Sequence, residues 1–199
     1  MTRKIYIMRH GETLFNTQKR VQGWCDSPLT ENGIAQAQVA GAYFNEEGVT
    51  FDKVYSSTQE RATDTAKIVS GIEQVQQLKG LKEMNFGSFE AQPEHLLPKF
   101  RPGAKSFEDL LVSYGGEDII QVGKRVKDCV EEVLEMADGE TLLMVSHGAA
   151  MWGLMLELGI TFPEGLYFTN CSICEFEVTD KQLNLVKLID PLAEKIYDF

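Results

Sequence analysis

The sequence predicts an α/β fold: a three-layer α/β/α sandwich with a mostly parallel central sheet and a small inserted cap. Short apolar runs typical of buried strands alternate with longer segments whose apolar residues recur at helical spacing. No long linker, repeat or low-complexity tract interrupts the 199 residues, which predicts one domain over residues 1–199. Residues 84–116 break the alternation with three prolines and several glycines, and we expect them to form the cap insertion.

Strands are predicted where apolar or alternating residues lie between turn signals. The most apolar run is TLLMV at 141–145, and KIYIM at 4–8 also reads as a buried strand. The run at 74–78 is the weakest because it is rich in glutamine. The complete set of predicted strands is 4–8, 51–55, 74–78, 141–145, 173–178 and 183–188.

Four helices are predicted between these strands: residues 31–46, a helix that follows Ser57 or Thr58 and ends at about residue 70, residues 117–137 and residues 149–158. The third has the clearest amphipathic pattern. Thr30 is suited to cap the first helix, and Ser57 or Thr58 the second, because a short hydroxyl side chain accepts a bond from a free N–H of the first turn.

Composition excludes several classes of function. Lys and Arg number 19 against 30 Asp and Glu, giving a formal net charge of -11, so we expect no nucleic-acid partner. No segment approaches the length of a membrane span, and the first apolar run is too short for a signal peptide, so a cytoplasmic protein is expected.

Four cysteines add little chemistry. Cys171 and Cys174 form C-x-x-C, but no second pair completes a zinc site. The alternating stretch around them predicts that the two thiols point to opposite faces of the sheet and have a structural role. No other cluster of metal-ligand residues is evident, so no metal is expected.

Two of the three histidines follow predicted strands directly. The strand at 4–8 leads into Arg9-His10-Gly11, and the strand at 141–145 leads into Ser146-His147-Gly148. Ligands of parallel sheets bind beyond the carboxyl ends of the strands, so this pair marks a candidate site. Histidine is largely neutral near pH 7 and is a capable nucleophile for phosphoryl groups.

Two arginines are placed to serve the same chemistry. Phosphoryl transfer requires donors around the equatorial oxygens, and Arg9 adjoins the candidate nucleophile. Arg61 falls in the first turn of the helix predicted after Ser56-Ser57-Thr58. A cation there opposes the helix dipole, which is unfavourable unless an anion is nearby. An ordinary surface arginine remains the alternative for Arg61.

Five blocks of sequence resemble the histidine phosphatase (phosphoglycerate mutase-like) superfamily. They occur in the family's order, span nearly the whole chain, and together are far more specific than the R-H-G triplet alone. The blocks are Arg9-His10-Gly11-Glu12-Thr13 with Asn16; Gln22-Gly23-Trp24 with Asp26, Pro28-Leu29-Thr30, Gly33 and Gln36-Ala37; Ser56-Ser57 with Arg61-Ala62 and Thr65-Ala66; Leu81-Lys82-Glu83 with Gly87 and Glu90; and Val145-Ser146-His147-Gly148.

The resemblance implies a metal-independent phosphatase that hydrolyses phosphate monoesters of small metabolites through a phosphohistidine. His10 would be the nucleophile, and Glu83 would protonate the leaving oxygen and then activate water. The groups implied to hold the phosphoryl oxygens or the substrate are Arg9, Asn16, Gln22, Gly23, Arg61, His147 and Gly148.

Two alternatives stay open. A cofactor-dependent phosphoglycerate mutase would need a bisphosphoglycerate primer and further cations. The family's mutases resemble one another in a longer insert with an Arg pair and in a polar pair after the last histidine. This chain has only Arg101 in 84–116, and Ala149-Ala150 after Gly148, which favours hydrolysis. The second alternative is an inactive phosphate-binding protein on the same fold, which the retained residues disfavour.

Several other residues are ambiguous from sequence. Lys19, Arg20, Arg101 and Lys105 could bind an anionic substrate or simply face solvent. His95 could line the pocket mouth. Phe86, Phe89 and Phe100 could form an apolar wall or pack in the core. The identity of the substrate and the oligomeric state are not readable from the sequence.

Overall fold

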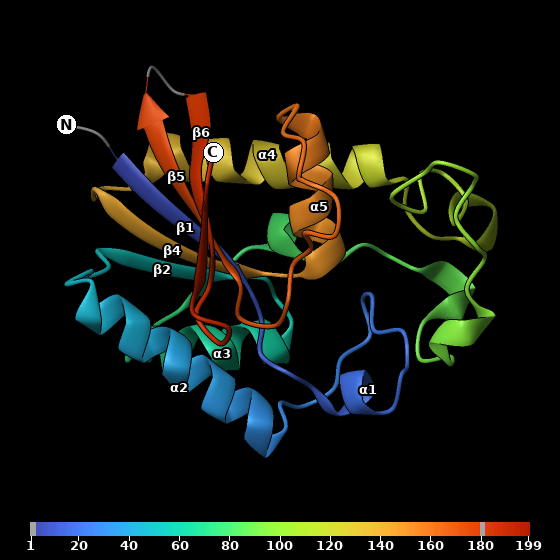
Figure 1. The fold of residues 1–199 in the computed structure, drawn as a ribbon, viewed down its shortest axis with the longest axis horizontal. Helices are drawn as coiled ribbons and strands as arrows, with labels where there is room; N and C mark the ends of the chain where they lie inside the picture. Colours follow the sequence, from blue (N-terminus) through green and yellow to red (C-terminus); the bar gives the residue numbers. More distant parts are fainter. Residues whose placement is uncertain (1–2, 180–181) are drawn as a thin grey trace.

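The computed structural model describes residues 3–179 and 182–199. Its centre is a seven-stranded sheet in the order β3-β2-β4-β1-β5-β6-β7, and helices cover both faces of the sheet (Figure 1). The predicted α/β class, a sheet flanked by helices, is confirmed. The strands are β1 Arg3–Arg9, β2 Lys53–Ser56, β3 Gln76–Gln77, β4 Thr141–Ser146, β5 Ile173–Thr179, β6 Gln182–Asp190 and β7 Lys195–Asp198.

The sheet is mixed. β1, β2, β3 and β4 run parallel to one another, whereas β5, β6 and β7 continue the sheet in antiparallel pairing from the edge of β1. β7 was not predicted from the sequence, because its alternation covers only four residues. The parallel half places the ends of β1 and β4 side by side, with Arg9 opposite Ser146.

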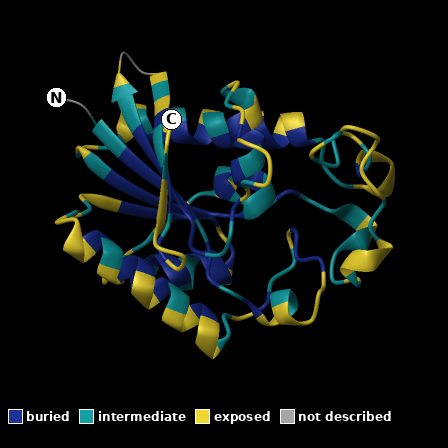
Figure 2. Cartoon of the chain, viewed as in Figure 1, coloured by how far each residue is buried: buried dark blue, intermediate teal, exposed yellow. Residues whose placement is uncertain are grey.

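Each face of the sheet has its own helices. The α-helices are α1 Leu14–Thr17, α2 Glu31–Glu46, α3 Glu60–Ser70, α4 Ile119–Met136 and α5 Gly148–Glu157. Side chains of α2 and α3 pack with one apolar cluster, and those of α4 and α5 pack with the other. Figure 2 shows the buried strands between helices whose outer faces are exposed.

The predicted helix starts were partly correct. Thr30 caps α2, its side chain accepting from the Gly33 N–H at 2.9 Å. The expected capping of α3 by Ser57 or Thr58 was wrong: the N-cap residue is Gln59, which makes no side-chain capping bond. Ser57 is instead fully buried, and its hydroxyl contacts His147.

The two C-x-x-C thiols lie in different apolar clusters, as the opposite-face prediction requires. Cys171 packs on the α2–α3 side and Cys174 on the α4–α5 side. Cys171 precedes β5 rather than lying in it, and its φ is +59°. Burial raises the pKa of both thiols, which makes them poor nucleophiles.

Residues 84–116 are irregular, with 3₁₀ turns η2 Gly87–Phe89, η3 Glu94–Leu96 and η4 Val112–Tyr114. They lie beyond the carboxyl end of the parallel strands (Figure 1, green to yellow-green). A cap role for them remains a prediction. No helix of the described residues is both long and apolar enough to cross a membrane.

Candidate active site

His10 and His147 meet at the carboxyl edge of the sheet. Each follows the last residue of one of two adjacent parallel strands, β1 and β4. Their ring centroids are 5.1 Å apart, and both side chains are buried. The parallel register therefore brings together two residues that are 137 positions apart in the chain.

The contacts of His10 leave one ring nitrogen available as a nucleophile. Nδ1 donates to the carbonyl oxygen of Gly11 at 2.7 Å, so the lone pair lies on Nε2. Arg61 Nε donates to this Nε2 at 3.3 Å. The pKa of His10 is well below its usual value, first because the ring is buried and then because Arg61 and Arg9 repel a second positive charge. The imidazole is therefore neutral at pH 7.

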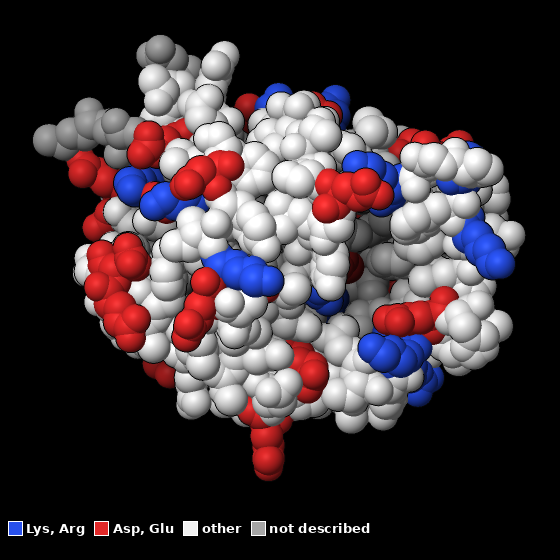
Figure 3. All heavy atoms as spheres, in the orientation of Figure 1, with Lys and Arg blue, Asp and Glu red and all other residues white. Residues whose placement is uncertain are grey.

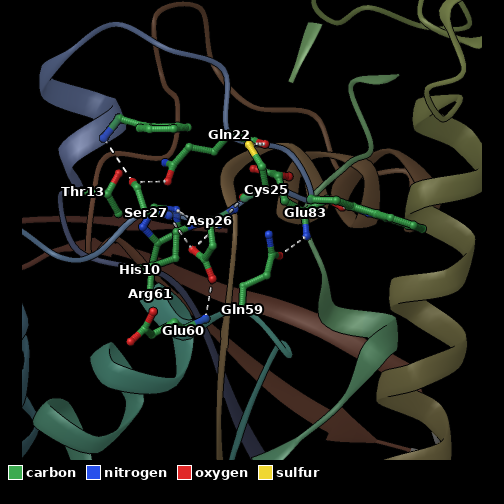
Figure 4. Close-up of polar contacts among 12 residues, drawn as sticks. His10, Thr13, Gln22, Cys25, Asp26, Ser27, Gln59, Glu60, Arg61 and Glu83 are labelled. Atoms are coloured by element: carbon green, nitrogen blue, oxygen red, sulfur yellow. Dashed lines mark hydrogen bonds and ion pairs between the residues drawn. The ribbon is translucent and has the colours of Figure 1, made fainter. Parts of the chain in front are cut away.

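Arg61 is fully buried in the first turn of α3, where an isolated cation would be unfavourable. Asp26 is an anion close to this cation. Its Oδ1 accepts from Arg61 Nη1 at 2.7 Å, and its Oδ2 accepts from the Glu60 N–H at 2.5 Å (Figure 4). The other guanidinium contacts are with the carbonyl oxygens of Cys25 and Gly23, each at 3.0 Å. This network fixes the guanidinium against His10.

Two buried donors near His10 have no hydrogen-bond partner within the described chain: Arg9 Nε and His147 Nδ1. Arg9 Nη1 is held by the carbonyl oxygen of Phe168 at 2.7 Å, which anchors the guanidinium. Burial lowers the pKa of Arg9, and that of His147 is well below its usual value for the same reason. Unsatisfied buried donors are uncommon, and an anion would supply the missing acceptors.

Glu83 is held at the N-terminus of α5. Its carboxylate accepts from the backbone N–H groups of Met84 at 2.8 Å, Ala150 at 2.9 Å and Ala149 at 3.3 Å. Its own N–H donates to Gln59 Oε1 at 3.0 Å, a contact drawn in Figure 4. The carboxyl group is thus positioned by backbone contacts on two segments.

The carbonyl oxygen of Glu83 is also bonded. It accepts from Trp24 Nε1 at 2.9 Å and from Arg125 Nη2 at 2.8 Å. Arg125 additionally donates to the carbonyl oxygens of Gly80 and Lys82 and pairs with Glu117. The segment that carries Glu83 is therefore fixed along its length.

One cavity of about 330 Å³ collects nearly all of the predicted site residues. Its lining includes Arg9, His10, Asn16, Gln22, Gly23, Arg61, Glu83 and Gly148. His147 does not line it but lies fully buried beside His10. The molecule is visibly hollowed on the face drawn in Figure 3, with Lys and Arg atoms beside the hollow.

Asn16 and Gln22 each have one side-chain oxygen already engaged. Asn16 Oδ1 accepts from the backbone and the hydroxyl of Thr13, both at 3.1 Å, and Gln22 Oε1 accepts from Ser27 Oγ at 3.0 Å. Their amide NH₂ groups are the parts that can serve an anion. Gly23 adopts φ +57°, and a Cβ there would lie 2.5 Å from Glu90 Oε1, so the turn requires glycine.

The ambiguous residues separate clearly. Arg20 lines the cavity. Arg101 pairs with Glu108 and Asp109 instead, and Lys105 lines a neighbouring cavity. Phe86 lines the first cavity, Phe100 the neighbouring one, and Phe89 packs edge-on against Tyr114.

Sequence reasoning missed three supporting residues. Asp26 and Ser57 stood inside blocks of the family resemblance, but Asp26 was assigned no role and Ser57 only that of a possible helix cap. Gln59, which is 3% exposed, bridges Glu83 and the Gly23 carbonyl oxygen, to which its Nε2 donates at 2.6 Å. A polar residue at a helix start gave no signal that its amide reaches two other loops.

Comparison with known proteins shows the family to which this chain belongs. The model of the histidine phosphatase superfamily (branch 1) matches residues 5–191. A probable phosphoglycerate mutase (GpmB) of Yersinia pestis is 33% identical over 184 residues, covering 85% of this chain and 82% of that protein.

Solved structures agree. Bacillus stearothermophilus YhfR superposes with a TM-score of 0.78 at 30% identity, over 92% of this chain and 94% of that one. A phosphoserine phosphatase of Entamoeba histolytica, solved with 3-phosphoglyceric acid, gives 0.75 at 27% identity, over 94% and 96%. The chain therefore belongs to the histidine phosphatase superfamily, branch 1.

Proposed function

We propose that this enzyme is a phosphatase that hydrolyses phosphate monoesters through a phosphohistidine on His10. The observation that supports this most strongly is the pair of unpartnered buried donors, Arg9 Nε and His147 Nδ1, beside a neutral imidazole whose Nε2 carries the lone pair. A phosphoryl group next to His10 would give both donors an acceptor. Glu83 lines the same cavity and can exchange a proton with the substrate.

In the first step, His10 Nε2 attacks phosphorus and the bond from phosphorus to the ester oxygen breaks. Glu83, in its protonated form, gives its proton to that oxygen, and the alcohol leaves. Arg9 and Arg61 balance the charge that spreads over the three equatorial oxygens, and the neutral ring of His147 donates a hydrogen bond to one of them. The Nε–H of Arg61, which donates to His10 Nε2, would donate to a phosphoryl oxygen instead, while Asp26 and the two carbonyl oxygens keep the guanidinium in place.

In the second step, water attacks the phosphohistidine. The Glu83 carboxylate takes one proton from that water. At the same time the water oxygen bonds to phosphorus and the bond between phosphorus and His10 Nε2 breaks. Inorganic phosphate leaves, His10 returns to its neutral form, and Glu83 is protonated again. One carboxyl group serves both steps because the second reverses the proton flow of the first.

The charges around the cavity support hydrolysis over mutase activity. Its basic lining residues among those described are Arg9, Arg20 and Arg61, and two of these are committed to the phosphoryl site. Only Arg20 is left to hold a substrate carboxylate. Arg101, the one arginine of the 84–116 segment, is neutralised by Glu108 and Asp109.

Phosphoglycerate mutase activity is the second candidate, and one specific observation favours it. The Yersinia pestis relative, 33% identical over 184 residues, bears the name of a probable phosphoglycerate mutase. A mutase and a phosphatase share the first step, so they differ only in what accepts the phosphoryl group.

The deciding experiment measures phosphate release from a panel of monoesters, including phosphoserine and 3-phosphoglycerate, beside 2- to 3-phosphoglycerate interconversion primed with bisphosphoglycerate. We expect release without interconversion. His10→Ala should lose covalent phosphorylation and on the order of a million-fold in turnover. His95→Ala is the matched control, because His95 is exposed and does not line the cavity.

Interconversion with little release would identify a mutase. Wild-type turnover in His10→Ala would show that the nucleophile is wrong. Phosphate binding without any transfer would identify an inactive binding protein.

A further inference from the structure

A second cavity, of about 450 Å³, adjoins the first. Phe107, Gly148 and Ala149 line both. Gly148 and Ala149 begin α5, the helix whose N-terminus holds the Glu83 carboxylate. The alcohol portion of an ester bound at His10, whose oxygen would receive a proton from Glu83, would therefore lie next to the second cavity.

We infer that the second cavity binds the alcohol portion of the substrate, and that this portion is an aromatic or other bulky apolar group. The inference rests on the proposed hydrolysis at His10 and names the class of ester on which it acts. The cavity is continuous with the phosphoryl site through the shared lining residues, so one molecule can occupy both.

The walls of the second cavity are chiefly apolar and aromatic. Phe100 and Tyr167 line it and keep 46% and 69% of their surface exposed, so a ligand in the cavity would remove apolar ring surface from water. Phe107 packs edge-on between Phe100 and Phe86, with ring centroids 4.7 and 5.7 Å away. A planar apolar group would extend this series of rings.

The polar groups of the second cavity do not favour another anion. Its charged lining residues, among those described, are Lys105 and Glu164, one of each sign. Trp152 also lines it, and its Nε1 is buried without a partner in the described chain.

Paired substrates test the inference without changing the chemistry. Ethyl phosphate and 2-phenylethyl phosphate both release a primary alkoxide of similar basicity, so the difference between them reports binding of the ring. We expect kcat/KM for the phenylethyl ester to exceed that for the ethyl ester by at least about ten-fold. Burial of a single methylene in an apolar pocket can raise kcat/KM by about that factor, and a phenyl group buries more apolar surface.

Phe100→Ala should narrow this ratio several-fold, because it removes one wall of the second cavity. Leu96→Ala is the matched control: Leu96 is 51% exposed, belongs to the same 84–116 segment, and lines neither cavity. The control should keep the wild-type ratio.

The outcomes separate the two proposals. Equal kcat/KM for both esters, with clear phosphate release, would overturn the apolar subsite and leave the hydrolase intact. A ratio that Phe100→Ala and Leu96→Ala change equally would also overturn it. No release from either ester by folded wild-type protein would overturn the proposed hydrolysis, and the subsite with it.

Discussion

Ser57 Oγ lies 2.7 Å from His147 Nε2, and this contact sets which nitrogen of His147 carries the proton. Ser57 Oγ already accepts from the Gln59 N–H at 3.2 Å. The hydroxyl is fully buried, so its own proton needs an acceptor, and Nε2 is the one within reach. The network therefore assigns the ring proton to Nδ1, the atom left without a partner beside His10.

Ser57→Ala should remove the hydrogen bond that Ser57 Oγ donates to His147 Nε2. The ring of His147 would lose its preference for the Nδ1–H tautomer, and we expect kcat to fall about ten- to a hundred-fold. Ser57→Thr, which keeps the hydroxyl, should restore much of the rate. Ring ¹⁵N chemical shifts of His147 provide the direct measurement. An unchanged Nδ1–H tautomer in Ser57→Ala would contradict the assignment, whatever the rate.

Much of the site was predictable because it depends on local signals. His10 and His147 follow apolar strands, and parallel strands bring their carboxyl ends to one edge of the sheet. The wrong cap of α3 has a physical reason in the same region. Ser57 has the chemistry of a cap, but its hydroxyl is taken by His147, and Asp26 bonds the Glu60 N–H from 34 positions away.

Glu83 shows the limit of the sequence alone. Nothing local distinguishes it from a solvated loop carboxylate, and only the family resemblance singled it out. Its position depends on the N-terminus of α5, on Gln59 and on Arg125, which are all distant in sequence. The apolar cavity beside it likewise depends on how residues 84–116 fold over α5, which no periodicity encodes.

Glu83→Gln should slow esters with basic alkoxide leaving groups far more than aryl esters. Gln cannot give up a proton, and a good leaving group needs little protonation in the transition state. We expect a loss of about 10²–10⁴-fold for alkyl esters and a much smaller loss in phosphoenzyme formation from aryl esters. Burst kinetics separate this first step from hydrolysis. Equal slowing of the first step for all esters would argue against the role as acid.

Gln59→Met should reproduce part of the Glu83→Gln pattern. The substitution keeps a similar volume but removes the bonds to the Glu83 N–H and the Gly23 carbonyl oxygen. We expect kcat for alkyl esters to fall about ten-fold, because small misplacements of a proton donor are costly. KM should change little.

Gln92→Met is the matched control for this experiment, because Gln92 is exposed. Loss of two buried hydrogen bonds should also cost about 1–3 kcal/mol of unfolding free energy in Gln59→Met. Rescue of the alkyl-ester rate by a better leaving group would show positioning of Glu83. A uniform loss across all esters would instead indicate general disruption of the fold.

The free energy of unfolding should fall as the pH drops below about 6.5, the ordinary histidine value. His10 and His147 are buried with pKa values well below this, so the unfolded chain binds two protons that the folded chain does not. Stability is therefore unaffected by this pair above about pH 7 and lost on acidification. If the fold kept both imidazoles neutral down to pH 5, the loss from pH 7 to 5 would reach roughly 4 kcal/mol, which is the upper bound for this pair.

Denaturant unfolding at pH 7, 6 and 5 measures this loss, and His10→Gln should remove about half of the pH dependence. Inorganic phosphate should reduce the loss as well, because an anion beside the imidazoles favours their protonated forms and binds only the folded chain. His95→Gln is the control and should leave the slope unchanged, because His95 is exposed. A pH dependence identical in wild type and His10→Gln would mean that His10 is not held neutral by the fold.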